Sequence, residues 1–362
     1  MNVLVKKYWL ILVVPIVYLI FISPYINSDI SPNNHNLIIT LTTVENWLED
    51  GALTHDFNLI NALGNKGDIN VHYYSRVMNE EGRNYFVSYP PLSFIVFYGV
   101  IKLFNPSDLV IAFKIFGVFI HLISFWLVFN ILRKKMNLWP AHLLAGLFLF
   151  FPSSIVLSLM YYPEQLIIPL ILLFIIVIEA PGGRYRNYFL VQLSFLLVYC
   201  DWLGTLLIAS VVFYNVLVAK DKNFKEPSLL VAGGLSGGII LLLQYSSING
   251  LEALFHGLKL RYLERSGVFL ESYSDRGVNL YSSNTWIYLY KHLLPTLVGT
   301  IIGLFFVNFQ KVKIWNSKWF WIVIVPVLLH MIFIFNSNIL HFQNLAKLSF
   351  VFILGPVLWI TI

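Results

Sequence analysis

Long runs of apolar residues, separated by short polar segments, dominate this chain. A helix needs about 20 mostly apolar residues to cross a membrane. The pattern therefore predicts an all-α fold, a polytopic bundle of about ten spanning helices in a single integral membrane domain, residues 1–362. The expected spans are Tyr8–Tyr25, Leu109–Leu132, Leu138–Met160, Gln165–Ala180, Tyr188–Asp201, Leu203–Val218, Leu229–Gln244, Trp286–Val307, Trp319–Phe335 and Leu348–Ile362.

One apolar run, Pro90–Phe104, has only about 15 residues, which is short for a span. If this run does not cross, the basic turns of the chain all fall on the side of Lys6 and Lys7. Those turns hold Arg133 to Lys135, Arg184 with Arg186, Lys220 with Lys222 and Lys225, and Lys311 with Lys313. Because cytoplasmic loops carry an excess of Lys and Arg, this arrangement predicts a cytoplasmic N-terminus and a juxtamembrane helix at 90–104.

Two long segments are then expected on the outer face, Ile26–Tyr89 and Ser246–Asn284, and both are too short and too apolar to be separate modules. In the first, Leu37, Leu41, Val44 and Leu48 recur at helical spacing, and Gly51 ends the pattern. This helix is too short and too polar to span, so we expect it to lie along the membrane surface.

Composition supports a membrane protein and narrows the possible partners. Hydrophobic residues make up 58% of the chain and charged residues 12%, about half the usual share of charge in a soluble domain. The net charge of +6 reflects Lys and Arg beside helix ends, so we expect no nucleic-acid partner. The one cysteine, Cys200, excludes a disulfide framework, and the chain has no zinc-type His/Cys spacing and no nucleotide-binding loop. We therefore expect no bound metal and no cofactor, although a need for a divalent metal is left open.

The order of these elements resembles a known family of membrane enzymes. A first spanning helix is followed by an outer segment that contains Asn36–Gly51, and then by Ser88-Tyr89-Pro90-Pro91-Leu92 at the start of a second surface helix. These features, with the basic turn at Arg133 to Lys135, resemble the GT-C superfamily of glycosyltransferases. The architecture is similar to that of protein O-mannosyltransferases and the aminoarabinose transferases of lipid A. The resemblance covers roughly Lys6 to Ala180.

The resemblance implies an acidic residue at the start of the first surface helix, where it acts as the base or binds the acceptor. Here that place is taken by His35 and Asn36, and Asp29 lies one helical turn earlier. We therefore expect the catalytic base to be Asp29, as a partly desolvated carboxylate, or His35, as an imidazole that titrates near neutrality. Either residue also has a purely structural interpretation, as a loop aspartate or a polar helix start.

Two further acidic residues are candidate catalytic residues. Glu164 begins a spanning helix from the outer side, where the family has an acidic residue, although favourable interaction with the helix dipole also explains it. Asp201 interrupts an apolar hairpin with no basic neighbour in sequence, and a charge at that depth is costly unless it faces a cavity or a partner. A polar turn between two spans is the alternative.

Substrate binding is assigned to Glu45, Tyr89, Arg261 and Arg265. The two arginines follow Leu251, Leu254 and Leu258 on one helical face, so we expect them in the membrane interface at headgroup depth. Arginine suits a lipid-linked phosphate, but generic anchoring to anionic lipid explains the pattern equally well. Glu45 lies beside the apolar stripe of its helix and is also explained as a solvated side chain.

These features predict a multi-pass enzyme of the cell membrane whose active face lies outside. It would move a sugar from a polyprenyl-phosphate-linked donor to a hydroxyl on a glycan, lipid or protein acceptor. Asp29, His35, Glu164 and Asp201 are expected to meet in one outward-facing cavity. A transporter or flippase for a lipid-linked glycan, and a non-catalytic membrane scaffold, are the alternatives.

Overall fold

The computed structural model describes residues 2–28, 34–63, 76–161, 163–219, 224–266, 318–333 and 347. This part of the chain is predominantly helical, as predicted. The helices are α1 (Asn2–Ile26), α2 (Asn34–Asp50), the short 3-10 helix η1 (Ala52–His55), α3 (Leu92–Phe104), α4 (Leu109–Leu132), α5 (Leu138–Phe150), α6 (Pro152–Ser158), α7 (Pro163–Glu179), α8 (Arg184–Cys200), α9 (Trp202–Phe213), α10 (Lys225–Ser266) and α12 (Val325–Phe333). The π-helical segments η2 (Tyr214–Val218) and η5 (Phe320–Ile324) continue α9 and precede α12.

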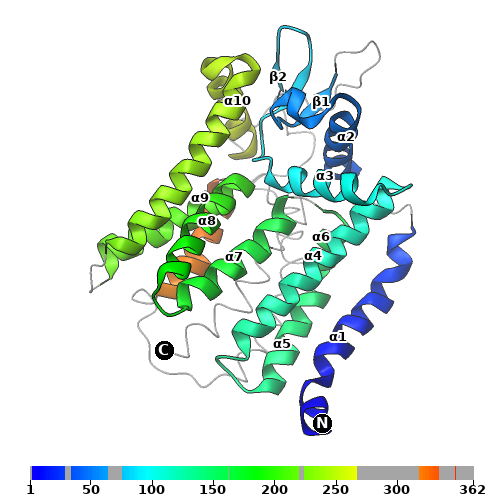
Figure 1. The fold of residues 1–362 in the computed structure, drawn as a ribbon, viewed down its shortest axis with the longest axis vertical. Helices are drawn as coiled ribbons and strands as arrows, with labels where there is room; N and C mark the ends of the chain where they lie inside the picture. The colour runs from blue at the N-terminus through cyan, green and yellow to red at the C-terminus, as the bar shows by residue number, and fades with distance from the viewer. Residues whose placement is uncertain are drawn as a thin grey trace, which may run out of the picture.

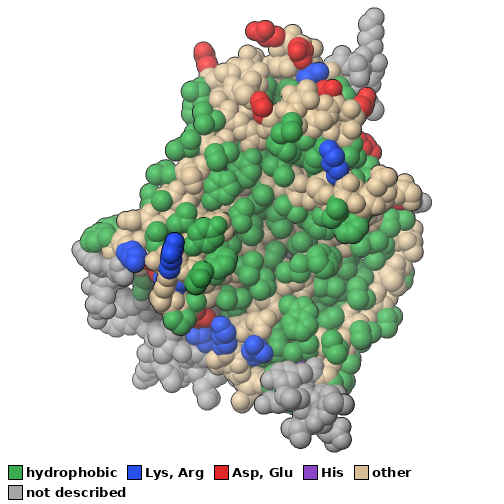
Figure 2. Space-filling model, in the orientation of Figure 1, with side chains coloured by type: hydrophobic (Ala, Val, Ile, Leu, Met, Phe, Trp, Pro, Cys, Tyr) green, Lys and Arg blue, Asp and Glu red, His purple; other side chains and the backbone are tan. Residues whose placement is uncertain are grey.

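The helices form a bundle that carries a separate layer at one end (Figure 1). Helices α1, α4, α5 and α7 run steeply along the long direction, and α2 with the strands lies beyond their upper ends. Figure 2 shows hydrophobic side chains over the middle of this face, Asp and Glu at the end with the strands, and a group of Lys and Arg near the opposite end.

Fewer helices than predicted have the length and apolarity of a membrane span. Within the described ranges, Leu109–Leu132 and Lys225–Leu260 pass that test, and a third passes if the bent pair α5 and α6 is one span. Shorter apolar helices cover Ile11–Ile26, Gln165–Glu179, Trp202–Val218 and Phe320–Phe333. The expected spans Trp286–Val307 and Leu348–Ile362 lie outside the described residues, so ten spans remain a prediction.

The expected span Leu138–Met160 is broken into α5 and α6, which meet at 61°. Pro152 lacks a backbone N–H and disfavours helical geometry at the residue before it, so Phe151 is extended, with φ −61° and ψ 131°. The carbonyl of Leu149, close to the break, has Nε2 of His121 at 3.4 Å.

Helix α3 lies across the ends of the bundle helices rather than along them (Figure 1). It packs against α2 on one side and against α4, α7 and α8 on the other. Pro91 precedes its first turn, and Asn105 ends it in a left-handed conformation (φ 44°). The apolar run 90–104 therefore forms a helix of 13 residues, and its position along a membrane surface stays a prediction.

We call the layer beyond the ends of the bundle helices, which consists of α2, η1 and the strands, the outer layer. It contains strands that the all-α prediction missed. Strands β1 (Ile60–Ala62), β2 (Arg76–Met78) and β3 (Asn84–Phe86) form an antiparallel sheet in the order β1-β3-β2. Each strand has three residues, which is too short for alternation of apolar and polar residues to be visible in the sequence.

The described parts of the two segments predicted to lie outside pack together as one layer. Helix α10 is kinked at Asn249 and Gly250, where both residues leave helical geometry, and its outer part packs on β2. A side chain at Gly257 would contact Val77 and Val87 of the sheet region. Leu254 is fully buried here, so the predicted apolar stripe is covered in part by protein rather than by lipid.

Candidate functional site

Asp201 lies in the break between α8 and α9, as the interrupted apolar run predicts. Its backbone is extended (φ −158°), and its carboxylate caps α9 by accepting a hydrogen bond from the N–H of Leu203 at 2.7 Å. Gly204 allows the two helices to approach closely, because a Cβ there would lie 2.0 Å from the carbonyl oxygen of Leu197. Only 1% of Asp201 is exposed.

A histidine and a lysine from a distant part of the chain lie beside this carboxylate. Nε2 of His330 lies 3.8 Å from Oδ1 of Asp201, and Nζ of Lys347 lies 3.8 Å from Oδ2. Nζ of Lys347 also lies 3.2 Å from Nε2 of His330. Because an ammonium group can only donate, Nε2 acts as the acceptor in this contact, and the ring is then neutral with its proton on Nδ1. The cluster therefore holds one negative and one positive charge.

The Asp201 cluster differs from the ion pairs at the basic end of the bundle. There Glu226 is bound by Arg186 at 2.5 Å and by Lys318 at 2.9 Å, in hydrogen-bonded contacts that join α8, α10 and the residues just before η5. In the Asp201 cluster the carboxylate and the ammonium are 3.8 Å apart, longer than a charge-assisted hydrogen bond of about 2.8 Å. The Glu226 group thus has the short, hydrogen-bonded geometry of ion pairs that hold helices together, and the Asp201 group does not.

The segment that leads into α3 is held directly beside this cluster. Trp202, next to Asp201, donates its indole N–H to the carbonyl of Ser88 at 2.9 Å. Tyr245 of α10 donates its hydroxyl to the carbonyl of Tyr89, and Tyr161 donates to the carbonyl of Ser93 at 2.9 Å. Three aromatic side chains from different parts of the bundle thus fix the backbone around Pro90 and Pro91, which have no N–H to donate.

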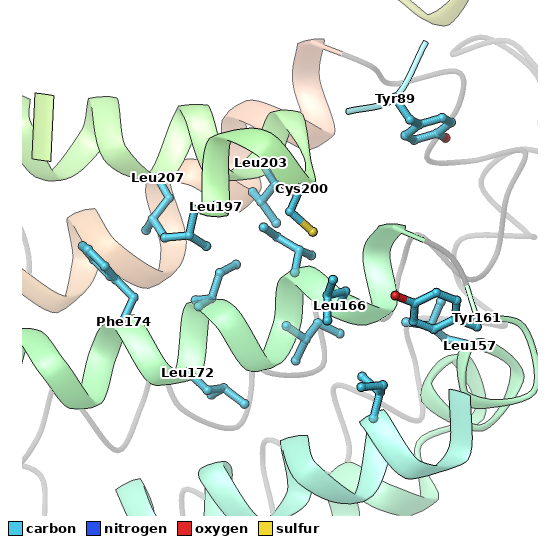
Figure 3. Close-up of a cluster of buried hydrophobic side chains, with 14 of the residues drawn as sticks. Tyr89, Leu157, Tyr161, Leu166, Leu172, Phe174, Leu197, Cys200, Leu203 and Leu207 are labelled. Carbon is cyan, nitrogen blue, oxygen red and sulfur yellow. The ribbon is translucent and has the colours of Figure 1, made fainter. Parts of the chain in front are cut away.

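An apolar cluster packs beneath these contacts. Figure 3 shows Leu197, Cys200 and Leu203 from α8 and α9 facing Leu166 of α7, with Tyr161 at the edge of the group. Cys200 is fully buried, and its sulfur lies 3.5 Å from Oγ of Ser93. Cys200 and Leu203, on either side of the turn at Asp201, are therefore anchored in the apolar core.

A groove of about 440 Å³ begins beside the cluster and follows α9 and α10. Its walls include Trp202, Thr205 and Val212 on one side and Val231, Gly234 and Gly238 on the other. Almost all of its surface is apolar, so it suits a hydrocarbon chain better than a polar ligand.

A second polar network lies within the outer layer. Nε2 of His55 is 3.1 Å from Oδ2 of Asp50, its Nδ1 is 3.0 Å from the hydroxyl of Tyr85, and Arg83 lies 3.2 Å from the same Asp50 oxygen. Burial and the nearby Arg83 lower the pKa of His55 against the opposing effect of Asp50. Burial also raises the pKa of Tyr85. The network joins the end of α2 to β3.

The predicted site residues fall into three groups. Asp201 and Tyr89 are buried on adjacent elements, whereas Glu45 is exposed on α2. Only the backbone is described for His35 in the first turn of α2, Glu164 in the first turn of α7, and Arg261 and Arg265 in the outer part of α10. Asp29 lies outside the described residues. The expected meeting of all four catalytic candidates in one cavity therefore stays a prediction.

Sequence reasoning selected neither His330 nor Lys347 as a site residue. His330 interrupts the apolar run Trp319–Phe335, and an ionisable residue inside a predicted span is by default a candidate functional residue. That signal was sufficient to select His330, but the sequence contains nothing that pairs it with Asp201.

Neither a metal-binding group nor a similar known protein adds evidence about the function of the Asp201 cluster. Among the described residues, no group of three or more His, Cys, Asp and Glu side chains is arranged to hold a metal ion. No protein-family model, curated protein or solved structure matches the chain.

Proposed function

We propose that this protein is a GT-C-type glycosyltransferase that moves a sugar from a polyprenyl-phosphate-linked donor to an acceptor hydroxyl at the outer face of a cell membrane. The observation that carries the proposal is the Asp201, His330 and Lys347 cluster. Isolated charges inside a membrane bundle cost a few kcal/mol each on insertion scales, and they mark substrate or ion sites more often than they stabilise the fold.

The location of the cluster supports a lipid-linked substrate. It lies where the lead-in to α3, the turn between α8 and α9, and the outer part of the bundle meet. The apolar groove that starts at Trp202 offers a place for a hydrocarbon chain with its phosphate near Lys347. The other proposed phosphate ligands are Arg261 and Arg265, and Glu45 and Tyr89 are proposed to contact the acceptor or the sugar.

In this proposal the acceptor oxygen attacks the anomeric carbon of the donor. The bond from that carbon to the phosphate oxygen breaks, the phosphate leaves with the electron pair, and the acceptor proton passes to Asp29 or His35. Negative charge grows on the leaving phosphate, so a preorganised cation lowers the barrier. Lys347 supplies that charge, and Asp201 holds its ammonium group in place before the donor binds.

The proposed topology places all chemistry on one side. The N-terminus and the turn between α4 and α5 are cytoplasmic, and α2, the sheet and α3 are outside, in a bundle of about ten spans. This proposal rests on the uneven distribution of Lys and Arg between the two ends of the chain's apolar helices.

The test is a transfer assay with purified protein, a polyprenyl-phosphate sugar and a hydroxyl acceptor. We expect Lys347→Met and Asp201→Asn to lower kcat by at least 100-fold, in the range seen when one stabilising group is removed from a transition state. Glu226→Gln is the matched control, because it neutralises a carboxylate that also has two basic partners, Arg186 and Lys318, at the other end of the bundle. Full activity of both cluster variants would contradict the proposed site.

A transporter or flippase for a lipid-linked glycan is the second candidate. The breaks at Phe151–Pro152 and at Asp201 favour it, because discontinuous helices line the substrate sites of many transporters. Protein reconstituted in vesicles distinguishes the two, since a flippase moves the lipid-linked sugar between leaflets without changing it.

A further inference from the structure

We propose that a groove between α1 and α5 binds one anionic glycerophospholipid at the basic end of the bundle. The groove has a volume of about 470 Å³ and is lined by Val14 of α1 and by Trp139, Leu143, Gly146, Leu147 and Phe150 of α5. Its surface is almost wholly apolar, so a fatty acyl chain is the chemistry that fits it. It is separate from the groove beside Asp201, which lies between α9 and α10.

Trp139 indicates the level in the membrane at which this groove lies. This side chain is 69% exposed in the first turn of α5 and stands at one end of the groove. Exposed tryptophan is enriched at the level of lipid headgroups. An acyl chain in the groove therefore has its headgroup beside the turn that joins α4 to α5.

That turn carries three basic side chains, Arg133, Lys134 and Lys135. Arg133 and Lys134 are exposed, and within the described part of the chain neither contacts a carboxylate. Lys135, in contrast, is paired with Glu179 of α7 at 3.0 Å. Two basic side chains beside an acyl groove complement a phosphate headgroup that carries a net negative charge. A zwitterionic lipid has the same acyl chains but no net negative charge, so it should bind more weakly.

Gly146 provides the means to block the groove. A Cβ at this position would lie 3.5 Å from a methyl of Val14, an ordinary contact, so a larger side chain extends into the groove without a backbone clash. The matched control is Gly238, which lines the other groove and has nothing within 4 Å of its Cβ position.

The experiment is native mass spectrometry of delipidated protein in detergent, titrated with dioleoyl-phosphatidylglycerol or dioleoyl-phosphatidylcholine. We expect one saturable phosphatidylglycerol adduct. Because each basic residue near an anionic lipid contributes roughly fivefold in affinity, we expect Arg133→Gln with Lys134→Gln to weaken it by about 30-fold. Gly146→Leu should abolish the adduct, whereas Gly238→Leu and Arg184→Gln, at an exposed arginine at the start of α8, should leave it unchanged.

Equal affinity for the two lipids would overturn the proposal, as would a phosphatidylglycerol adduct that survives both the double substitution and Gly146→Leu. The double substitution changes only exposed side chains, so it keeps the test valid if Gly146→Leu fails to fold. Binding is measured without catalysis, so loss of the proposed transferase function would leave this result unaffected.

Discussion

Nζ of Lys347 lies 3.8 Å from Oδ2 of Asp201, and each residue is only 1% exposed. Removal of one member of a buried ion pair leaves an uncompensated charge, which costs about 3–5 kcal/mol. We expect Asp201→Asn and Lys347→Met each to lower the stability of the detergent-solubilised protein by about that amount, measured by thermal unfolding. The double variant should be more stable than either single variant. Additive losses would show that the two charges do not interact.

The aromatic contacts around Pro90 and Pro91 should fix the start of α3. Tyr245→Phe removes the hydroxyl that donates to the carbonyl of Tyr89, a contact worth about 1 kcal/mol. We expect faster hydrogen exchange in the residues that lead into α3, together with a loss of activity. Tyr262→Phe is the control, because Tyr262 is 50% exposed on the same helix. Equal hydrogen exchange before α3 in both variants would show that the Tyr245 hydroxyl does not fix this segment.

The stability of the outer layer should depend on pH through His55. Burial lowers the pKa of His55 in the folded protein, whereas the unfolded value is about 6.5. As pH falls below about 6.5, His55 becomes protonated in the unfolded chain but stays neutral in the folded layer. The free energy of unfolding therefore decreases with falling pH until the pKa of His55 in the folded state is passed. Hydrogen exchange of α2 and β3 at pH 7.5 and 5.5 measures this. His55→Gln should flatten the dependence, and His256→Gln, at an exposed histidine, should preserve it.

Lys114 should stabilise the outer end of α1. It is 3% exposed, and its ammonium group donates to the carbonyls of Tyr25, Ile26 and Ser28 at 3.3, 3.2 and 2.5 Å. A cation at the last carbonyls of a helix satisfies their hydrogen bonds and interacts favourably with the dipole. We expect Lys114→Met to cost about 2 kcal/mol, since hydrogen bonds to charged groups contribute about that much. Lys102→Met, at an exposed lysine near the end of α3, should cost far less.

The proposed topology can be tested by single-cysteine labelling, because the only native cysteine, Cys200, is buried. Glu80 lies in the outer layer and Asn137 in the turn before α5, and both are exposed. A membrane-impermeant maleimide should label Glu80→Cys in intact cells and Asn137→Cys only after permeabilisation. Labelling of both sites from the same side would refute the arrangement.

Local sequence patterns determined most helices and several of their ends. The predicted span Leu109–Leu132 coincides with α4, and the run Pro90–Phe104 contains α3. The break at Asp201 was also predictable. Apolar periodicity, proline and a capping carboxylate act over a few residues, so the helices and breaks that they specify can be recognised within a single segment of the sequence.

Only the tertiary structure decided which polar groups meet. The partners of Asp201 are His330 and Lys347, which lie more than a hundred positions further along the chain, and no local pattern encodes that pairing. The sheet of three-residue strands and the network of His55 with Asp50 and Tyr85 likewise depend on contacts between separate segments. The physical reason is that the charge pattern of a sequence specifies which side chains are costly to bury, whereas the folded packing alone specifies what neutralises them.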